Sequence, residues 1–141
     1  MPRAGFALHP QLAADTFEIG RFDLSRVLLM NDARFPWLIL VPERSDLTEL
    51  VDLRPGELHR LSDEIRRASL GLRELFRPDK LNVAALGNMV PQLHVHVIAR
   101  FRTDAAWPRP VWGGPPAPPY PAAAAVKRIN DLRAALRLTS S

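Results

Sequence analysis

Two histidines and a glutamine alternate with apolar residues in the segment from Gln92 to Ile98. Side chains of an extended strand alternate between its two faces, so Gln92, His94 and His96 are predicted to share one face, with about 7 Å from one to the next. The apolar residues between them would then point into the core. Two imidazoles and an amide are costly to bury without partners, so this face is predicted either to bind something or to lie exposed.

The imidazole pair permits three interpretations. The first is a half-exposed strand with two chance histidines. The second is a metal site in which the pair supplies two ligands and a third comes from His9, His59 or a carboxylate, although the sequence places neither of those histidines beside the strand. The third is chemistry on phosphate, because neutral imidazole attacks phosphorus and leaves well, while a neighbouring imidazole or amide holds phosphate oxygens or protonates the leaving group.

The third interpretation is favoured, since the chain has only four histidines and two of them stand in its strongest strand pattern. Such chemistry requires no metal and no organic cofactor. The absence of cysteine excludes a thiol nucleophile, a disulfide scaffold and a Cys-ligated metal centre.

Composition and charge set the class of protein. The chain has 141 residues, of which 47% are hydrophobic and 24% charged, as expected for one ordinary globular domain. The net charge is +4, but only two of the 19 cationic residues are lysines and the arginines are scattered among acidic residues, so no specific nucleic-acid binding is expected. No apolar stretch approaches the roughly 18–20 residues that span a bilayer, and no signal peptide is recognisable. We therefore expect a cytoplasmic protein with no membrane association.

The imidazole pair must be positioned by a sheet. Five strands are predicted from alternation, apolar runs and flanking prolines or turn residues, around Phe17–Ile19, Ser25–Met30, Trp37–Val41, Leu81–Ala85 and Leu93–Ile98. The second and third runs are separated by only a few residues, so an antiparallel hairpin is the simplest connection between them.

One long helix is predicted over Pro55–Phe76, since Pro55 suits a first helical turn and Pro78 stops the helix. Its predicted apolar face consists of Leu58, Leu61, Ile65, Leu72 and Leu75. Residues 103–121 are dense in proline and are predicted to wrap as an extended arm, after which a helical pattern runs over 122–138. The predicted fold is one α+β domain over 1–141, with an antiparallel sheet, the long helix packed on it, a core at about 6–112, and an arm plus C-terminal helix at 103–141.

The segment Gly87–Ile98 resembles the signature of the histidine triad (HIT) superfamily of nucleotide hydrolases and transferases, in which three histidines alternate with apolar residues. Leu29–Asp32 followed by Trp37–Pro42 is similar to the hairpin of that family. The helix Pro55–Phe76 falls where the family has its long helix. The resemblance extends from about residue 17 to residue 112, which is most of the chain.

The resemblance implies roles for both histidines. His94 matches the central histidine, which attacks the α-phosphorus and becomes transiently nucleotidylated. His96 matches the last histidine, which contacts phosphate oxygens near the leaving group. Either Asn31 or Asp32 matches the residue that binds the ribose hydroxyls, and the two alternatives stay open.

Three further residues take implied roles in substrate binding. Asn82 and Asn88 match positions that face the phosphates. Trp107, followed by proline, resembles a Trp-Pro pair of one branch of the family. In that family the C-terminal tail of one subunit reaches the site of the other, so Trp107 is a candidate for such a contact.

The sequence departs from the family's pattern at three polar positions. Gln92 stands where the first histidine usually stands, and glutamine hydrogen-bonds without titrating, so it is expected to orient the site. Met89 stands where a serine or threonine hydroxyl often supports the leaving group. Pro36 or Trp37 stands where many members have a histidine, and Trp37 is interpreted as a core residue.

The resemblance implies a homodimeric enzyme that hydrolyses a bond to the α-phosphorus of a purine nucleotide, which would be a phosphoramidate, an acyl-adenylate or a dinucleoside polyphosphate. The expected catalytic residues are His94, His96 and Gln92. The expected substrate-binding residues are Asn31, Asp32, Asn82, Asn88, Met89 and Trp107. The alternative is a catalytically weak nucleotide-binding or sensing module, which the three altered positions favour.

Overall fold

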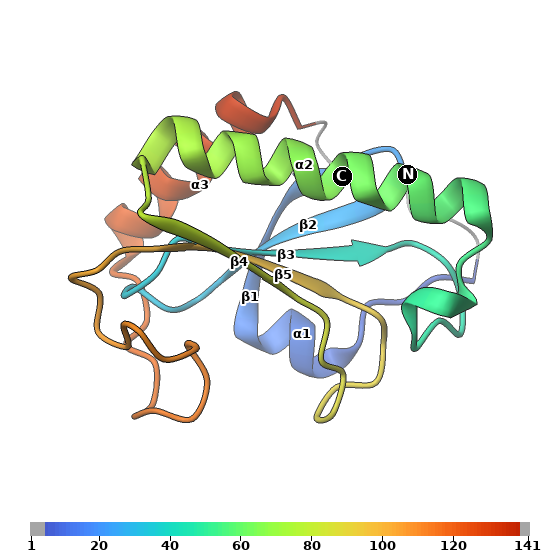
Figure 1. Cartoon of the computed structure of the whole chain (residues 1–141), viewed down its shortest axis with the longest axis horizontal. Helices are drawn as coiled ribbons and strands as arrows, with labels where there is room; N and C mark the ends of the chain where they lie inside the picture. Colours follow the sequence, from blue (N-terminus) through green and yellow to red (C-terminus); the bar gives the residue numbers. More distant parts are fainter. Residues whose placement is uncertain (1–4, 139–141) are drawn as a thin grey trace.

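A five-stranded antiparallel sheet organises the chain in a computed structural model that describes residues 5–138. The strand order is β1-β2-β3-β5-β4 (Figure 1). The strands are β1 (Thr16–Arg21), β2 (Ser25–Met30), β3 (Trp37–Pro42), β4 (Lys80–Ala84) and β5 (Val95–Arg100). The predicted α+β fold, with its antiparallel sheet, is confirmed.

The long helix is α2 (Pro55–Phe76), with the bounds that the sequence predicts. Pro55 occupies its first turn, where the missing N–H costs nothing, and the side chain of Glu57 accepts a hydrogen bond from the backbone N–H of Arg54 at 3.2 Å. The helix ends at Arg77, whose backbone is left-handed with φ 49°. Two further helices, α1 (Pro10–Asp15) and α3 (Ala122–Leu136), and a short 3₁₀ turn, η1 (Leu50–Asp52), complete the regular structure of the described residues.

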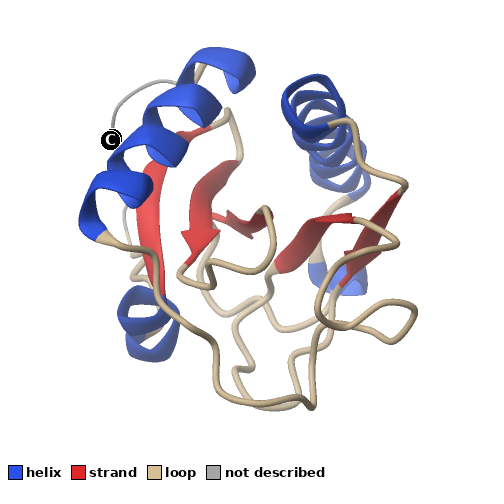
Figure 2. Cartoon of the chain, turned by 90° about the vertical axis from the view of Figure 1, so that its left-hand side faces the viewer, coloured by secondary structure: helices blue, strands red, loops and turns tan. Residues whose placement is uncertain are grey.

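The two faces of the sheet carry two separate apolar clusters. Helices α2 and α3 cover one face, where Leu38 and Leu40 of β3 and the valines of β5 are buried (Figure 2). Trp37, Ile39 and Val41 alternate with those leucines, so they point to the opposite face. That second face is covered by α1 and by parts of the chain before and after the strands (Figures 1 and 2).

Residues 101–121 contain no helix or strand, as their proline density predicts. This arm is held at its start by Arg100, whose guanidinium pairs with Asp104 at 2.8 Å and donates to the carbonyl of Arg109. Near its end, the backbone N–H of Ala33 donates to the carbonyl of Pro118 at 2.8 Å. The arm is therefore held at both ends, and its residues Ala106 and Val111 are buried in the apolar cluster on the second face.

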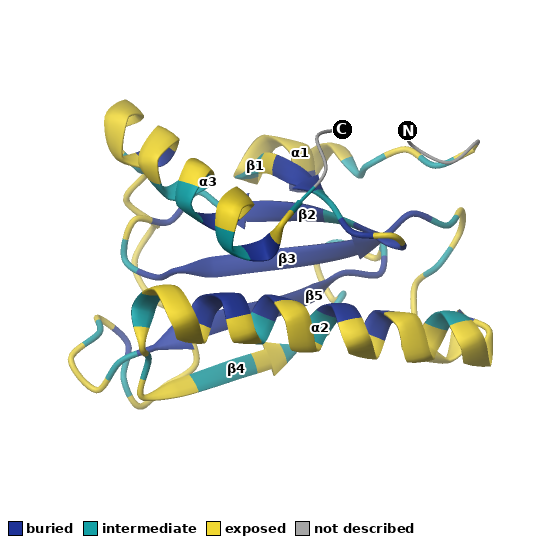
Figure 3. Cartoon of the chain, turned by 90° about the horizontal axis from the view of Figure 1, so that it is seen from above, coloured by how far each residue is buried: buried dark blue, intermediate teal, exposed yellow. Residues whose placement is uncertain are grey.

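Three details of the predicted elements need correction. The last strand begins at Val95 and not at Leu93, because the backbone N–H of Leu93 donates to the carbonyl of Leu47 in a loop. Helix α1 was not predicted. In α2, Leu58 and Leu75 are 39% and 37% exposed, and the buried side of the helix consists of Leu61, Glu64, Ala68, Gly71 and Leu72 (Figure 3).

Within residues 5–138, no helix is long and apolar enough to cross a membrane.

Candidate active site

The two histidines meet where the loop before β5 enters the sheet. His94 is the last residue before β5 and His96 lies inside it, opposite Ile39 of β3 and Ala84 of β4. Both imidazoles are buried, at 6% and 4% exposure, and their ring centroids are 4.9 Å apart. The structure therefore brings together the two histidines that the sequence singled out, on the sheet face away from α2.

The partner of His94 assigns its tautomer. The Nδ1 atom of His94 lies 2.7 Å from the backbone carbonyl oxygen of Gln92. A carbonyl oxygen only accepts, so Nδ1 carries the proton and donates it. In neutral His94, Nε2 then has a free lone pair, which is the form of imidazole that acts as a nucleophile or a base.

The partner of His96 assigns the opposite tautomer. The indole Nε1–H of Trp37 donates to Nδ1 of His96 at 2.9 Å, and an indole nitrogen only donates. Nε2 of His96 therefore carries the proton in the neutral ring. Burial, with a smaller contribution from neighbouring His94, lowers the pKa of His96 to about 3, so this imidazole stays neutral at physiological pH.

A third aromatic residue closes the ring cluster around His96. Trp112 comes from the arm, and its ring centroid lies 4.9 Å from that of His96 and 5.7 Å from that of Trp37. The residue of the arm that the sequence predicted near a site was Trp107, as a candidate for contact with the site of a second subunit. The structure places Trp107 against the guanidinium of Arg100, 5.8 Å from its ring centroid.

A cavity of about 500 Å³ opens beside the two indoles, within the size range of small-molecule sites. Trp37 and Trp112 line it together with Asn31, Asp32 and Arg34. The Asn31 side-chain oxygen accepts the backbone N–H of Tyr120 at 2.8 Å. Both carboxylate oxygens of Asp32 are bound by Arg34, at 3.0 and 2.9 Å. Asn31 and Asp32 thus both reach this cavity, each with a protein partner in place.

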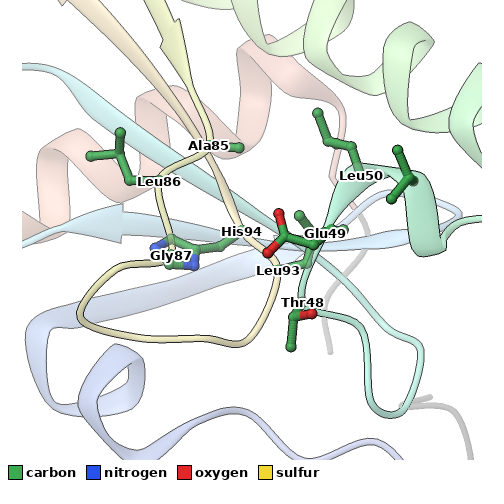
Figure 4. Close-up of a pocket in the computed structure, with 9 residues that line it drawn as sticks. Thr48, Glu49, Leu50, Ala85, Leu86, Gly87, Leu93 and His94 are labelled. Atoms are coloured by element: carbon green, nitrogen blue, oxygen red, sulfur yellow. The ribbon is translucent and has the colours of Figure 1, made fainter.

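A smaller cavity of about 200 Å³ lies on the loop side of His94 (Figure 4). His94 lines it together with apolar side chains from two segments, including Leu50 and Leu86. The carboxylate-bearing Glu49 also lines it, and the loop residue Gly87 forms part of the wall. His94 therefore lines the smaller cavity, and the two indoles that contact His96 line the larger one.

Gln92 holds three groups through three different atoms. Its side-chain oxygen accepts the backbone N–H of His9 at 2.8 Å, and its side-chain nitrogen donates to the carbonyl of Ala7 at 2.9 Å. Its backbone carbonyl holds His94. The amide that was expected to orient the imidazoles thus holds the N-terminal segment, and the main chain of the same residue orients His94.

The other predicted residues lie on β4 and in the loop before β5. Asn82 accepts a hydrogen bond from Arg100 at 2.9 Å. Asn88 and Met89 lie in the loop before β5, both exposed, Met89 to 93%. Among residues 5–138, no group of three or more histidine, cysteine, aspartate or glutamate side chains is placed to hold a metal ion.

The chain combines an antiparallel sheet, a long helix on one face and a buried imidazole pair on the other. Comparisons with known proteins identify the family to which this combination belongs. A family model described as the HIT domain matches residues 11–103. The chain therefore belongs to the histidine triad (HIT) family. Membership of this family supports a nucleotide-binding or hydrolase-type function in general.

Solved structures give the same result. A histidine triad protein from Bradyrhizobium japonicum is 49% identical, with a TM-score of 0.91, over 93% of this chain and 98% of that one. A histidine triad protein from Marinobacter aquaeolei is 48% identical, with a TM-score of 0.92, over 95% and 98% of the two chains. A HIT protein from Sinorhizobium meliloti is 42% identical, with a TM-score of 0.90, over 92% and 96%. No curated protein matches the chain.

Proposed function

We propose that this chain hydrolyses a bond to the α-phosphorus of a purine nucleotide through a covalent nucleotidyl-His94 intermediate. The observation that carries the proposal is the opposite protonation of the two imidazoles, which are 4.9 Å apart. His94 offers a lone pair on Nε2, and His96 offers an N–H at the same position of its ring. One imidazole is suited to attack phosphorus and the other to hold the charged oxygens.

The proposed reaction has two displacements at phosphorus. In the first, Nε2 of His94 forms a bond to the α-phosphorus, the bond to the leaving group breaks, and the leaving group departs with the electron pair and takes up a proton from solvent. The modified imidazole keeps its proton on Nδ1 and becomes cationic, and the carbonyl of Gln92 accepts a hydrogen bond from it. In the second, water attacks phosphorus, loses a proton to solvent, and His94 leaves as the neutral ring.

The larger cavity is the proposed nucleoside site. It lies against Trp37 and Trp112, the two indoles in ring contact with His96, and Asn31 and Asp32 line it. The substrate class of the proposal is a nucleoside phosphoramidate, an acyl-adenylate or a dinucleoside polyphosphate. The smaller cavity in contact with His94 then receives the leaving group.

Release of AMP from an adenosine phosphoramidate and from diadenosine tetraphosphate tests the proposal. We expect turnover in the presence of a chelator and a loss of at least about 1,000-fold in His94→Ala, because the nucleophile is removed. We also expect wild-type protein quenched with acid to carry an added nucleotide mass that His94→Ala lacks. His59→Ala is the matched control, since His59 is an exposed histidine of α2 and should leave turnover intact. Turnover that depends on added metal, or that survives in His94→Ala, would refute the mechanism.

Specific observations favour a second candidate, a nucleotide-binding or sensing module with weak turnover. The Gln92 amide is bound to the N-terminal segment, Met89 is exposed, and the Asp32 carboxylate is bound by Arg34. Each of these leaves one fewer polar group for substrate than the family's pattern offers. Binding of AMP at micromolar concentration without release of product or formation of an adduct would support this candidate.

A further inference from the structure

Trp37 is the first residue of β3 and reaches His96 across the sheet. The register pairs Ile39 with His96 and Trp37 with Ile98, so Trp37 lies diagonally from His96 on the same face. Long aromatic side chains span this diagonal, and here the indole nitrogen arrives 2.9 Å from Nδ1 of the imidazole. The indole is only 4% exposed and packs edge to face against Phe35 and Trp112. Its position is therefore fixed on several sides.

Among the residues in ring contact with His96 or opposite it on β4, only Trp37 makes a hydrogen bond to a ring nitrogen of His96. The ring is contacted by Trp37, by Trp112 from the arm and by His94 from its own segment, and Ala84 lies opposite on β4. No carboxylate is among these neighbours. A neutral imidazole without a fixed partner divides between two tautomers, and only the one with a proton on Nε2 is able to donate from that atom.

We propose that Trp37 is a positioning residue whose indole N–H holds His96 as the tautomer protonated on Nε2, and so makes His96 a hydrogen-bond donor to the substrate phosphate. The inference rests on the proposed function, in which His96 holds phosphate oxygens. Without the indole N–H, part of the His96 population carries its proton on Nδ1. In that form a lone pair of Nε2 faces the oxygen that bears the developing charge, and the interaction turns from attractive to repulsive.

The substitution Trp37→Phe removes the N–H and keeps an aromatic ring. We expect kcat to fall about 10- to 100-fold, as is usual when the residue that orients an active-site imidazole is changed. KM should stay within about threefold, because the lost interaction grows in the transition state. A loss of packing in Trp37→Phe could also lower kcat, but it would not by itself change the tautomer of His96. The tautomer is therefore measured directly by spectroscopy.

Nitrogen-15 chemical shifts of the His96 ring distinguish the two tautomers directly. In wild-type protein at neutral pH we expect a protonated Nε2 and an unprotonated Nδ1, with a coupling through the hydrogen bond between Nδ1 and the Trp37 indole nitrogen. Trp37→Phe should give averaged shifts for the two ring nitrogens. Trp112→Phe is the matched control for the tautomer, since Trp112 makes a T-shaped ring contact with His96, and it should leave the wild-type pattern of shifts.

The wild-type coupling measurement requires no variant, so the proposal stays testable if Trp37→Phe fails to fold. Absence of that coupling, or an unchanged tautomer in a folded Trp37→Phe, overturns the inference. A changed tautomer with unchanged kcat overturns it as well. If wild-type protein releases no AMP, the proposed function fails, and with it the role of His96 as donor to a phosphate, even where the spectra show that Trp37 sets the tautomer.

Discussion

At His96, burial and the indole donor act on the same imidazole in the same direction. Burial disfavours the charged ring. The indole N–H already occupies the lone pair of Nδ1, so a second proton on that atom would break the hydrogen bond. The folded state holds His96 neutral, since burial and, to a smaller extent, neighbouring His94 lower its pKa to about 3 from an ordinary value of 6.5. In the unfolded chain the same ring takes up a proton near its ordinary pKa.

This difference makes stability depend on pH in a defined window. Between about pH 6.5 and pH 3 the unfolded state binds a proton that the folded His96 does not, so acid favours unfolding there. His96→Asn removes the titrating group and keeps an oxygen near the Trp37 donor. We expect the free energy of unfolding of wild-type protein to fall more steeply from pH 7 to pH 5 than that of His96→Asn, by up to about 1.4 kcal/mol per pH unit. Urea titrations at both pH values measure this, and parallel slopes would contradict it.

Whether a residue of the site could be predicted depends on how far away its partner lies in the sequence. His94 and His96 could be predicted because they lie two residues apart in one segment. Trp37 is 59 residues from His96, and only the register between β3 and β5 brings them together. The contact of Trp112 with His96 depends on the path of an arm without regular structure, and no periodicity in the sequence predicts that path.

At the level of elements, the arm depends on one buried ion pair. The side chains of Arg100 and Asp104 are only 2% and 4% exposed, and Asp104 also accepts backbone N–H groups of Phe101, Ala106 and Trp107. These hydrogen bonds and the guanidinium outweigh the cost of burial and lower the pKa of Asp104 to about 2. The pair fixes the point at which the chain leaves the sheet and starts toward Trp112.

Asp104→Asn is expected to destabilise the protein by about 3 kcal/mol, because it leaves a buried guanidinium without its charge partner. The matched control is Asp131→Asn, which removes an exposed i,i+4 pair with Lys127 and should cost under about 1 kcal/mol. Urea unfolding at pH 7 compares them. The contribution of Asp104 is present above its ordinary pKa near 3.8 and is lost as pH falls toward 2, so the gap between wild type and Asp104→Asn should shrink in acid. Equal effects of the two substitutions would show that the arm does not depend on this pair.

The contact between α2 and α3 requires a residue without a side chain. A Cβ placed at Gly71 would overlap Cδ2 of Leu136, which is buried under α2. We expect Gly71→Ala to lower the free energy of unfolding by about 1–2 kcal/mol despite the better helix propensity of alanine. Gly56→Ala is the control in the same helix, since its Cβ would meet no atom within 4 Å and the change should be neutral or stabilising. Thermal unfolding separates the two, and a stabilised Gly71→Ala would contradict the packing argument.

Most elements follow from local patterns, and the exceptions have physical reasons. Helix α1 has only six residues, too few for a periodic pattern. Leu58 and Leu75 continue the apolar spacing of α2 but lie near its two ends, where they are partly exposed. Glu64 lies on the buried side of α2 because it accepts the backbone N–H groups of Leu24 and Ser25. These partners are about 40 residues away, so the sequence of the helix alone does not predict them.

For the whole molecule, the β4 edge of the sheet is the surface that we consider for association of two copies of the chain. Strand β4 is the last strand of the sheet and pairs with β5 on one side. Val83 on this strand is 49% exposed, and Leu86 just after it is 50% exposed. An open strand edge with exposed apolar side chains is suited to pairing with another chain. We propose that two copies associate through this edge.

Light scattering after size exclusion tests the proposal. We expect wild-type protein at about twice the chain mass of 15.8 kDa. Val83→Glu should shift it to the monomer, because a charge at the paired edge has to be desolvated. Val126→Glu places the same charge on an exposed position of α3 and should leave the dimer. A wild-type monomer would refute the dimer, and a dimer that survives Val83→Glu would refute its placement.

The aromatic cluster at His96 also makes the site optically visible. The chain has three tryptophans, and two of them, Trp37 and Trp112, contact His96 and line the larger cavity. Indole emission responds to the polarity and the quenchers around the ring, so a purine that enters this cavity changes the intrinsic fluorescence of the protein without any label. Trp107, which lies against Arg100, contributes the background signal, and a Trp107→Phe protein confines the emission to the two indoles that report on occupancy.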